Sequence, residues 1–285
     1  MSNTAFQTQY RQEFIAGFEQ KQSILRDTVT NEAVIKGNTA VFLVADSGGA
    51  TAVTRGVNGL IPARADNLNQ NSCTLVEWND LVRKTSFNVF ASQGDQRAIM
   101  QSTSMGVVNR KIDADIITAL DTGTVNAGNA AVTATVGLAM KAKTILQNAS
   151  IPWDSNITGL ITPAFEAYIA QAPEFSKATY VNSYPLKNED PAWRDKPVMF
   201  YWLGVMWVVH PNLVGKGTAA EHCYMYHKSA IGHAADTKGL QTPVGYDEEQ
   251  DYSWARTTIF VGSKVLQNAG IVQMIHDGSS FAPNT

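Results

Sequence analysis

The sequence predicts an α+β protein in which one unusually long helix follows a tail and a long loop. Apolar residues recur at helical spacing over residues 93–121, from Ile99 through Val108 to Leu120, so one helix should cover this segment. Strand-like runs lie on both sides of it. They are residues 39–44, 81–90, 198–209, 252–266 and 270–278. This layout is rare in compact enzymes and typical of a subunit that reaches its neighbours.

The first segment, residues 5–26, is rich in glutamine and amphipathic. Its aromatic residues recur every four positions, which on a helix places them along one face. They are Phe6, Tyr10, Phe14 and Phe18. This face covers either the protein's own core or a neighbouring subunit. In the second case the aromatics are the natural anchors, because large rigid side chains dominate interface energetics.

Residues 46–71 form a loop rich in glycine, asparagine and alanine between the strand runs at 39–44 and 81–90. Loops of this length are uncommon inside compact domains and are usually functional or mobile. In the second run, residues that favour strands alternate with polar ones, which indicates a strand with one buried face. We therefore predict that the two strands form a hairpin and that the loop projects from its end.

The long helix should span roughly 40 Å, at about 1.5 Å per residue. Gly106 lies inside it, costs about 1 kcal/mol relative to alanine and marks a point where the helix can bend. Further along, the sequence predicts a helix over 136–148 and another that begins near Pro163 with Thr162 as its N-cap. The run 198–209 is too uniformly apolar to alternate, which predicts one or two buried strands.

Composition narrows the classes of function. The net charge is −3 and no run of Lys and Arg exceeds two, which argues against a basic face for nucleic acid. Charged residues make up 16%, against roughly 25% in typical domains, which fits either a surface covered by other subunits or an ordinary low-charge protein. The longest apolar run is too short for the ~20 residues of a membrane-spanning helix. Neither a signal peptide pattern nor a CxxC pair occurs, so we expect a soluble protein from a reducing cytoplasm.

Three motifs suggest chemistry but lack its requirements. Residues 46–49, DSGG, resemble the nucleophile segment of chymotrypsin-like proteases, yet the first histidine is His210, so the required upstream base is missing. Residues 215–218, GKGT, do not have Lys followed directly by Ser or Thr, which a phosphate loop requires, and should form a turn. The spacing of His222, Cys223, His227 and His233 matches no common zinc pattern. We predict no catalytic, cofactor or metal site.

An acidic cluster near the last strands has several interpretations. Its members are Asp247, Glu248, Glu249 and Asp251. These carboxylates would suit an acid/base pair or a cation site. Two other interpretations are favoured: a solvated turn, or a contact with arginines of a neighbouring subunit. Arg55 and Arg64 in the long loop are the candidates for such arginines.

Taken in order, these segments resemble the major capsid protein of tailed bacteriophages, which has the Hong Kong 97-type fold. The stretches AEHCYMYHKSAIGHA and VGSKVLQNAGIVQMIHDG also look like the corresponding parts of phage coat proteins. The resemblance implies an N-terminal arm, a peripheral domain with an extended β-hairpin loop and a spine helix, and an inserted axial domain. The implied bounds are 1–30 for the arm, 31–134 and 246–267 for the peripheral domain, 135–245 and 268–285 for the axial domain, about 45–75 for the loop and 93–121 for the spine helix.

The same resemblance implies a non-enzymatic protein without cofactors that self-assembles into the icosahedral head shell. Its expected partners are copies of itself in pentamers and hexamers, a scaffolding and a portal protein, and optionally a decoration protein. It would enclose double-stranded DNA without binding it specifically, contact no membrane, and reach the virion after assembly in the cytoplasm of the bacterial host. We expect that removing residues 1–26 leaves a folded protein that fails to assemble.

Two features depart from some members of that family. Members that cross-link covalently carry a lysine in the extended loop, whereas this chain has none between Lys36 and Lys84, so we expect a non-covalent shell. Some relatives carry a long scaffolding segment ahead of the arm; here the arm begins almost at residue 1, so we expect a separate scaffolding protein. Two other classes stay open: a cytoplasmic enzyme whose site is assembled from distant residues, or a tail or decoration component of the virion.

Overall fold

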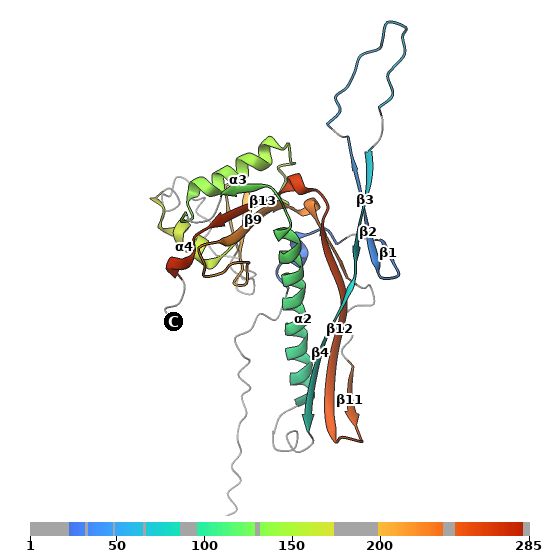
Figure 1. Ribbon diagram of the computed structural model, residues 1–285, viewed down its shortest axis with the longest axis vertical. Coiled ribbons are helices and arrows are strands. Elements are labelled where there is room, and N and C mark those ends of the chain that lie inside the picture. The colour runs from blue at the N-terminus through green and yellow to red at the C-terminus, as the bar shows by residue number, and fades with distance from the viewer. Residues whose placement is uncertain are drawn as a thin grey trace, which may run out of the picture. The chain divides into compact units, whose positions relative to one another are not determined.

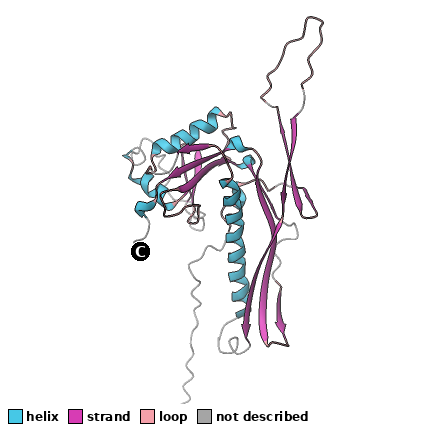
Figure 2. Cartoon of the chain, viewed as in Figure 1, coloured by secondary structure: helices cyan, strands magenta, loops and turns pink. Residues whose placement is uncertain are grey.

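The computed structural model describes residues 23–31, 34–47, 49–64, 67–85, 96–128, 132–173, 199–235 and 243–281. The predicted α+β class is confirmed, since helices and strands are mixed along the chain (Figure 2). Internal contacts divide the chain into two compact units. The smaller unit comprises Met1–Ser23, Glu77–Lys111 and Thr237–Ile259, and the larger unit comprises Ile24–Val76, Ile112–Asp236 and Phe260–Thr285.

The larger unit is built on a six-stranded sheet with the strand order β5-β13-β9-β6-β8-β7. Its strands are β5 Asn126–Gly128, β6 Ile157–Ile161, β7 Met199–Trp202, β8 Val205–Val209, β9 Glu221–His227 and β13 Ile271–His276. Strand β9 pairs antiparallel with β13 and β6, whereas β6 pairs parallel with β8. Helix α3 (Val136–Asn148) packs on β5 and β13 (Figure 1), and α4 (Pro163–Gln171) follows β6. The predictions of both helices and of strands within 198–209 are confirmed.

Aromatic side chains fill the core of this sheet. The largest that are fully buried are Trp207, Tyr224, Tyr226 and Phe165. Trp207 lies directly opposite Gly159 on the neighbouring strand, and a Cβ at residue 159 would lie 2.5 Å from the indole ring. Glycine is therefore needed at this position for space. Thr162 caps α4 as predicted, because its Oγ1 accepts the N–H of Phe165 at 3.2 Å.

A hairpin carries the long loop, and we call the two strands and the loop between them the loop hairpin. Its strands are β2 Thr39–Asp46 and β3 Asn67–Thr74, with β1 Val34–Lys36 beside β2. The prediction that residues 81–90 supply the return strand is wrong, since β3 pairs with β2 along its whole length. The loop is correspondingly shorter than the predicted 46–71. Strand β3 has the mostly polar sequence NLNQNSCT, so it lacks the apolar alternation that would have predicted it.

The long helix α2 spans Gln96–Asp121 and runs unbroken through Gly106. The first three residues of the predicted helix, 93–95, lie outside the described residues. Two strands, β4 Val76–Thr85 and β11 Val244–Asp247, both pair with the long strand β12 Tyr252–Val265. The predicted strand at 252–266 is confirmed, and residues 86–90 of the predicted run 81–90 are not among the described residues.

In the smaller unit, α2 buries one face at the expected helical spacing. Met100, Ser104 and Val108 are buried one turn apart. The ammonium group of Lys111 lies 3.8 Å from the centre of the Trp78 ring, a cation–π contact that ties this face to β4. None of the described helices is long and apolar enough to cross a membrane.

Candidate functional site

The N-terminal segment is fixed to the larger unit at residues 24–30, which we call the arm root. The carboxylate of Asp113 on α2 accepts the backbone N–H of Ile24 at 3.1 Å and that of Leu25 at 3.2 Å. Asp113 and Leu25 are both fully buried. Nε2 of His210 lies 3.6 Å from the same carboxylate. Nδ1 of His210 accepts the N–H of Asn212, so Nε2 is the ring nitrogen that faces Asp113.

Further hydrogen bonds hold the rest of the arm root. The hydroxyl of Thr28 donates to Leu25 O at 2.7 Å and lies 2.6 Å from the hydroxyl of Tyr226, which then donates to it. The N–H of Thr30 donates to Ile231 O at 3.1 Å. The chain before Ser23 therefore leaves from a fixed point. The aromatic residues Phe6, Tyr10, Phe14 and Phe18 precede this point and lie outside the described residues, so their role stays a prediction.

The far end of the loop hairpin is a small closed turn with solvent-exposed apolar side chains. Gly56 donates its N–H to Leu60 O at 3.0 Å, and Gly59, with φ of 72°, donates to Gly56 O at 2.8 Å. The guanidinium of Arg55 donates to Gly59 O at 3.4 Å. Val53, Val57, Leu60 and Ile61 are nevertheless exposed, with Val57 wholly so. Exposed apolar groups on a preformed turn are typical of an interaction surface.

One face of the loop hairpin also carries solvent-exposed apolar side chains. The register pairs Val34 with Val41 and Ala45 with Leu68, and paired residues point to the same side of a sheet. Val34, Leu43 and Leu68 are each more than half exposed on this side. The opposite side is buried through Phe42. The hairpin thus has one face packed against its own unit and one apolar face without a covering among the described residues.

The acidic cluster forms the turn between β11 and β12. Asp247 accepts the N–H groups of Glu249 and Gln250, each at 3.0 Å, and the bond from Gln250 is the main cause of its lowered pKa. The hydroxyl of Tyr246 donates to Asp251. The predicted turn is confirmed. Glu248 and Glu249 are exposed on it, in the smaller unit, while the exposed Arg55 and Arg64 belong to the larger unit.

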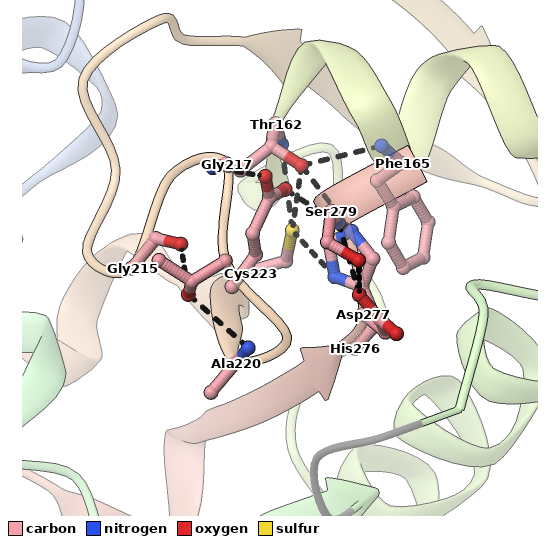
Figure 3. Close-up of polar contacts among 11 residues, drawn as sticks. Thr162, Phe165, Gly215, Gly217, Ala220, Cys223, His276, Asp277 and Ser279 are labelled. Atoms are coloured by element: carbon pink, nitrogen blue, oxygen red, sulfur yellow. Dashed lines mark hydrogen bonds and ion pairs between the residues drawn. The ribbon is translucent and has the colours of Figure 1, made fainter. Parts of the chain in front are cut away.

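A buried polar cluster in the six-stranded sheet is the strongest candidate for chemistry (Figure 3). Sγ of Cys223 lies 3.9 Å from Nδ1 of His276, and Nε2 of His276 lies 3.2 Å from a carboxylate oxygen of Glu221. This order of thiol, imidazole and carboxylate resembles that of an activated nucleophile. Thr162 joins the cluster, since its hydroxyl is 3.4 Å from His276 Nε2.

The environment of this cluster excludes nucleophilic chemistry. Cys223 and His276 have no exposed surface, so a substrate cannot reach them. Burial raises the pKa of the Cys223 thiol to about 12 and lowers the pKa of His276, and both shifts favour the neutral form of the group. Glu221 also accepts the N–H of Gly217 at 2.6 Å, in the predicted turn at 215–218. The cluster therefore ties that turn, α4, β9 and β13 together.

The three histidines at 222, 227 and 233, whose spacing matches no common zinc pattern, have separate partners. The pairs are His222–Asp121, His227–Asp154 and His233–Ser263, at 2.6, 2.9 and 2.9 Å. Among the described residues no group of three or more His, Cys, Asp and Glu side chains converges as metal ligands would. These histidines hold three places in the fold: the C-terminal end of α2, the loop before β6, and the pairing of β10 (Ile231–Ala235) with β12.

His233 predicts a loss of stability on mild acidification. Burial, with the nearby charge of Arg26, lowers its pKa from the ordinary 6.5 to about 4, although Asp113 opposes the shift. Between these values the unfolded chain binds a proton that the folded chain does not, so stability present above pH 6.5 is lost as the pH falls. We expect the free energy of unfolding to fall by up to about 1.4 kcal/mol per pH unit in this window from His233 alone. Urea unfolding at several pH values measures it, and His233→Asn should flatten the slope. An unchanged slope in that variant would contradict the assignment.

Comparisons with known proteins agree with this geometry. A sequence model of the family described as phage capsid protein matches residues 2–277. A structure from Mycobacterium phage Che8 is 15% identical, covers 92% of this chain and 97% of its own, and has a TM-score of 0.67. The capsid of Ralstonia phage GP4 is 11% identical over 100% of both chains, with a TM-score of 0.70. The capsid of a native GTA particle is 12% identical over 93% of both chains, also with 0.70. No curated protein matches the chain.

Proposed function

The chain belongs to the phage capsid protein family, and from this premise we propose that it is the major capsid protein that builds the head shell of a tailed phage through non-covalent arm and loop contacts. The observation that carries the proposal is the match over residues 2–277. The structural role of the family also implies a protein that is not an enzyme. The shell would consist of pentamers and hexamers and would enclose double-stranded DNA without specific contacts.

The loop hairpin supports this mode of assembly. The exposed apolar side chains at its tip and on its outer face would become buried only against another molecule. In a shell that molecule is a second copy of the chain. Head-to-tail contacts of this kind close into rings and then into a shell. Many modest contacts add up, so none has to be strong. The described part of the loop contains no lysine, which supports a non-covalent shell.

The domain division implied by the resemblance is part of the proposal. The arm would comprise residues 1–30, the peripheral domain 31–134 and 246–267, and the axial domain 135–245 and 268–285. Five of the six strands of the large sheet, all but β5, fall within the axial bounds together with α3 and α4, which supports this assignment. Scaffolding, portal and decoration proteins are proposed as partners, with assembly in the host cytoplasm.

Electron microscopy and size-exclusion chromatography of the purified full-length chain test the proposal. We expect capsomer rings or closed shells of megadalton size. Tubes would indicate a tail protein instead, and a discrete small oligomer would overturn the proposal in favour of an enzyme.

We further propose that loop arginines pair with the acidic turn of a neighbouring copy. Reversing Arg55 and Arg64 to glutamate should reduce the yield of shells, because like charges would then face each other at the contact. Reversing Glu248 and Glu249 to arginine in the same chain should restore the yield. Asp247 is left intact because it holds the turn.

Shell yield at low and high salt measures this effect. Reversal of the exposed Lys141 and Lys216 to glutamate, which changes the net charge by the same amount as the loop variant, serves as the control. A combined variant that is no better than the loop variant alone would contradict the pairing.

A further inference from the structure

The loop hairpin rests on a face of small residues. Strand β10 (Ile231–Ala235) pairs antiparallel with the end of β12, with Gly232 opposite Lys264 and Ala234 opposite Gly262. Paired residues point to the same side, and so do residues two apart on one strand. These four residues therefore share one face of the strand pair, and three of the four have a side chain no larger than a methyl group.

Strand β2 packs closely on Gly232. A Cβ at residue 232 would lie 2.7 Å from Cε1 and Cζ of the Phe42 ring. The ring is 2% exposed and forms a buried cluster with Ala40 and Ala234. The ring of Phe42 therefore lies directly on the backbone of β10.

Strand β3 packs just as closely on Gly262. A Cβ at residue 262 would lie 2.8 Å from the backbone oxygen of Thr74 and 3.3 Å from Sγ of Cys73. The ammonium group of Lys264 donates to Ser72 O at 2.8 Å, and the amide of Asn71 donates to Leu266 O at 3.3 Å. The contact at Gly262 is with the main chain, so added bulk there has to move the strand.

Neither glycine is needed for its backbone conformation. Positive φ values occur at other glycines, such as Gly37 and Gly59, but not at Gly232 or Gly262. An alanine is therefore tolerated by the local backbone at both positions. The requirement for glycine is one of space under the two strands of the hairpin, one glycine beneath each.

We propose that Gly232 and Gly262 form a saddle that fixes the angle at which the loop hairpin projects from the rest of the larger unit, and thereby where its tip meets a second copy. This inference rests on the proposed function for its consequence in assembly. The saddle lies at the base of the hairpin and the apolar turn at 55–60 lies at its far end. A small displacement at the base is therefore amplified at the tip. Gly232 and Gly262 are positioning residues, since neither has to touch the neighbouring copy.

The test compares Gly232→Ala and Gly262→Ala with the matched control Gly137→Ala. Gly137 is in α3 of the same unit, and a Cβ there would meet only Thr135 Oγ1 at 3.5 Å, an ordinary contact. Spin labels on Leu68→Cys, at the outer end of β3, and Lys141→Cys, on α3, report the hairpin angle in the unassembled subunit. Both sites are exposed. The native cysteines are replaced by serine in every chain of the series.

Electron–electron resonance should show a shifted distance distribution between the labels in both saddle variants and an unchanged one in the control. Electron microscopy of the unlabelled variants should show loss of closed shells of normal size. Phe42→Leu should restore both properties to Gly232→Ala, because it removes the ring that the new methyl group meets. It should not restore Gly262→Ala, whose contact is with the backbone of Thr74.

This selective rescue separates positioning from a general loss of stability, and it keeps the test valid if Gly232→Ala alone folds poorly. Wild-type distances in both saddle variants would overturn the proposal, and so would normal shells despite shifted distances. A wild-type chain that forms no shell would refute the proposed function instead, while the label distances would still decide whether the saddle orients the hairpin.

Discussion

A chain that starts at Ser23 after an initiator methionine is expected to fold normally and to build no shell. The hydrogen bonds that fix the arm root begin at Ile24, and the larger unit begins at the same residue. Losing residues 1–22 keeps every hydrogen bond of the arm root, so the free energy of unfolding of the larger unit should change by less than about 0.5 kcal/mol. Assembly should fail because the aromatic face of the arm is the proposed anchor on a neighbouring copy.

Thermal unfolding of the subunit and electron microscopy of the assembly reaction measure the two effects separately. A variant with its aromatics replaced by serine should behave like the truncation. The replaced residues are Phe6, Tyr10, Phe14 and Phe18. The matched control replaces Gln12 and Gln20, which fall on the opposite side of the same helical pattern, with alanine. Closed shells from the truncated chain would show that assembly does not require the arm.

The residue at which the N-terminal truncation ends determines whether it tests assembly alone. The expectation from sequence was that removal of residues 1–26 leaves a folded protein, but that deletion also removes Ile24 and Leu25, which Asp113 holds. Leu25 is fully buried, and loss of a buried leucine costs about 2–5 kcal/mol. A cut after residue 26 would therefore mix an effect on assembly with an effect on folding, whereas a cut after residue 22 isolates the arm.

Elements with strong local signals were predictable. Helix α3 was expected at its observed bounds, and α4 was expected from Thr162 and Pro163, because capping and periodicity act within one turn of helix. The apolar run at 198–209 became two strands joined by a turn at Leu203 and Gly204, both with positive φ. All these features depend on contacts between residues close in sequence.

Strand β3 was missed because its conformation depends on contacts at a distance. Its polar residues have little tendency of their own to form a strand, and pairing with β2 supplies the hydrogen bonds. Residues 81–85 of the run predicted at 81–90 belong to β4, which pairs with β12 much later in the chain, and residues 86–90 lie outside the described residues. Local sequence patterns report exposure on each face of a strand and do not report which strand is its partner.

The arm root was also missed, although one signal for it exists. Asp113 lies among Ile112, Ile116 and Ile117 on the buried side of α2, and a lone carboxylate in such a position needs partners. Its partners are 88 and 89 residues away, so only the fold reveals them. The proposed contact of Arg55 and Arg64 with the acidic turn is not visible in a single chain, since the partners are on another copy of the chain.

Replacing Asp113 with alanine is expected to lower the free energy of unfolding by about 3–5 kcal/mol, a range typical of breaking a buried charged network. The carboxylate accepts the N–H groups of Ile24 and Leu25 and faces Nε2 of His210, and all three groups would be left buried without it. Asp113→Asn should lose less, because it keeps one acceptor oxygen. Urea unfolding measures the loss, and Asp27→Ala, which removes an exposed carboxylate of the arm root, serves as the control.

Amide hydrogen exchange shows where that stability is lost. If Asp113 holds the arm root, exchange at Ile24 and Leu25 should accelerate in Asp113→Ala before the rest of the larger unit opens, because local release needs less free energy than global unfolding. The arm would then leave from an unfixed point, and shells should fail to form even under conditions in which the subunit stays folded. Normal protection at Ile24 and Leu25 in a destabilised variant would show that Asp113 stabilises α2 alone and does not position the arm.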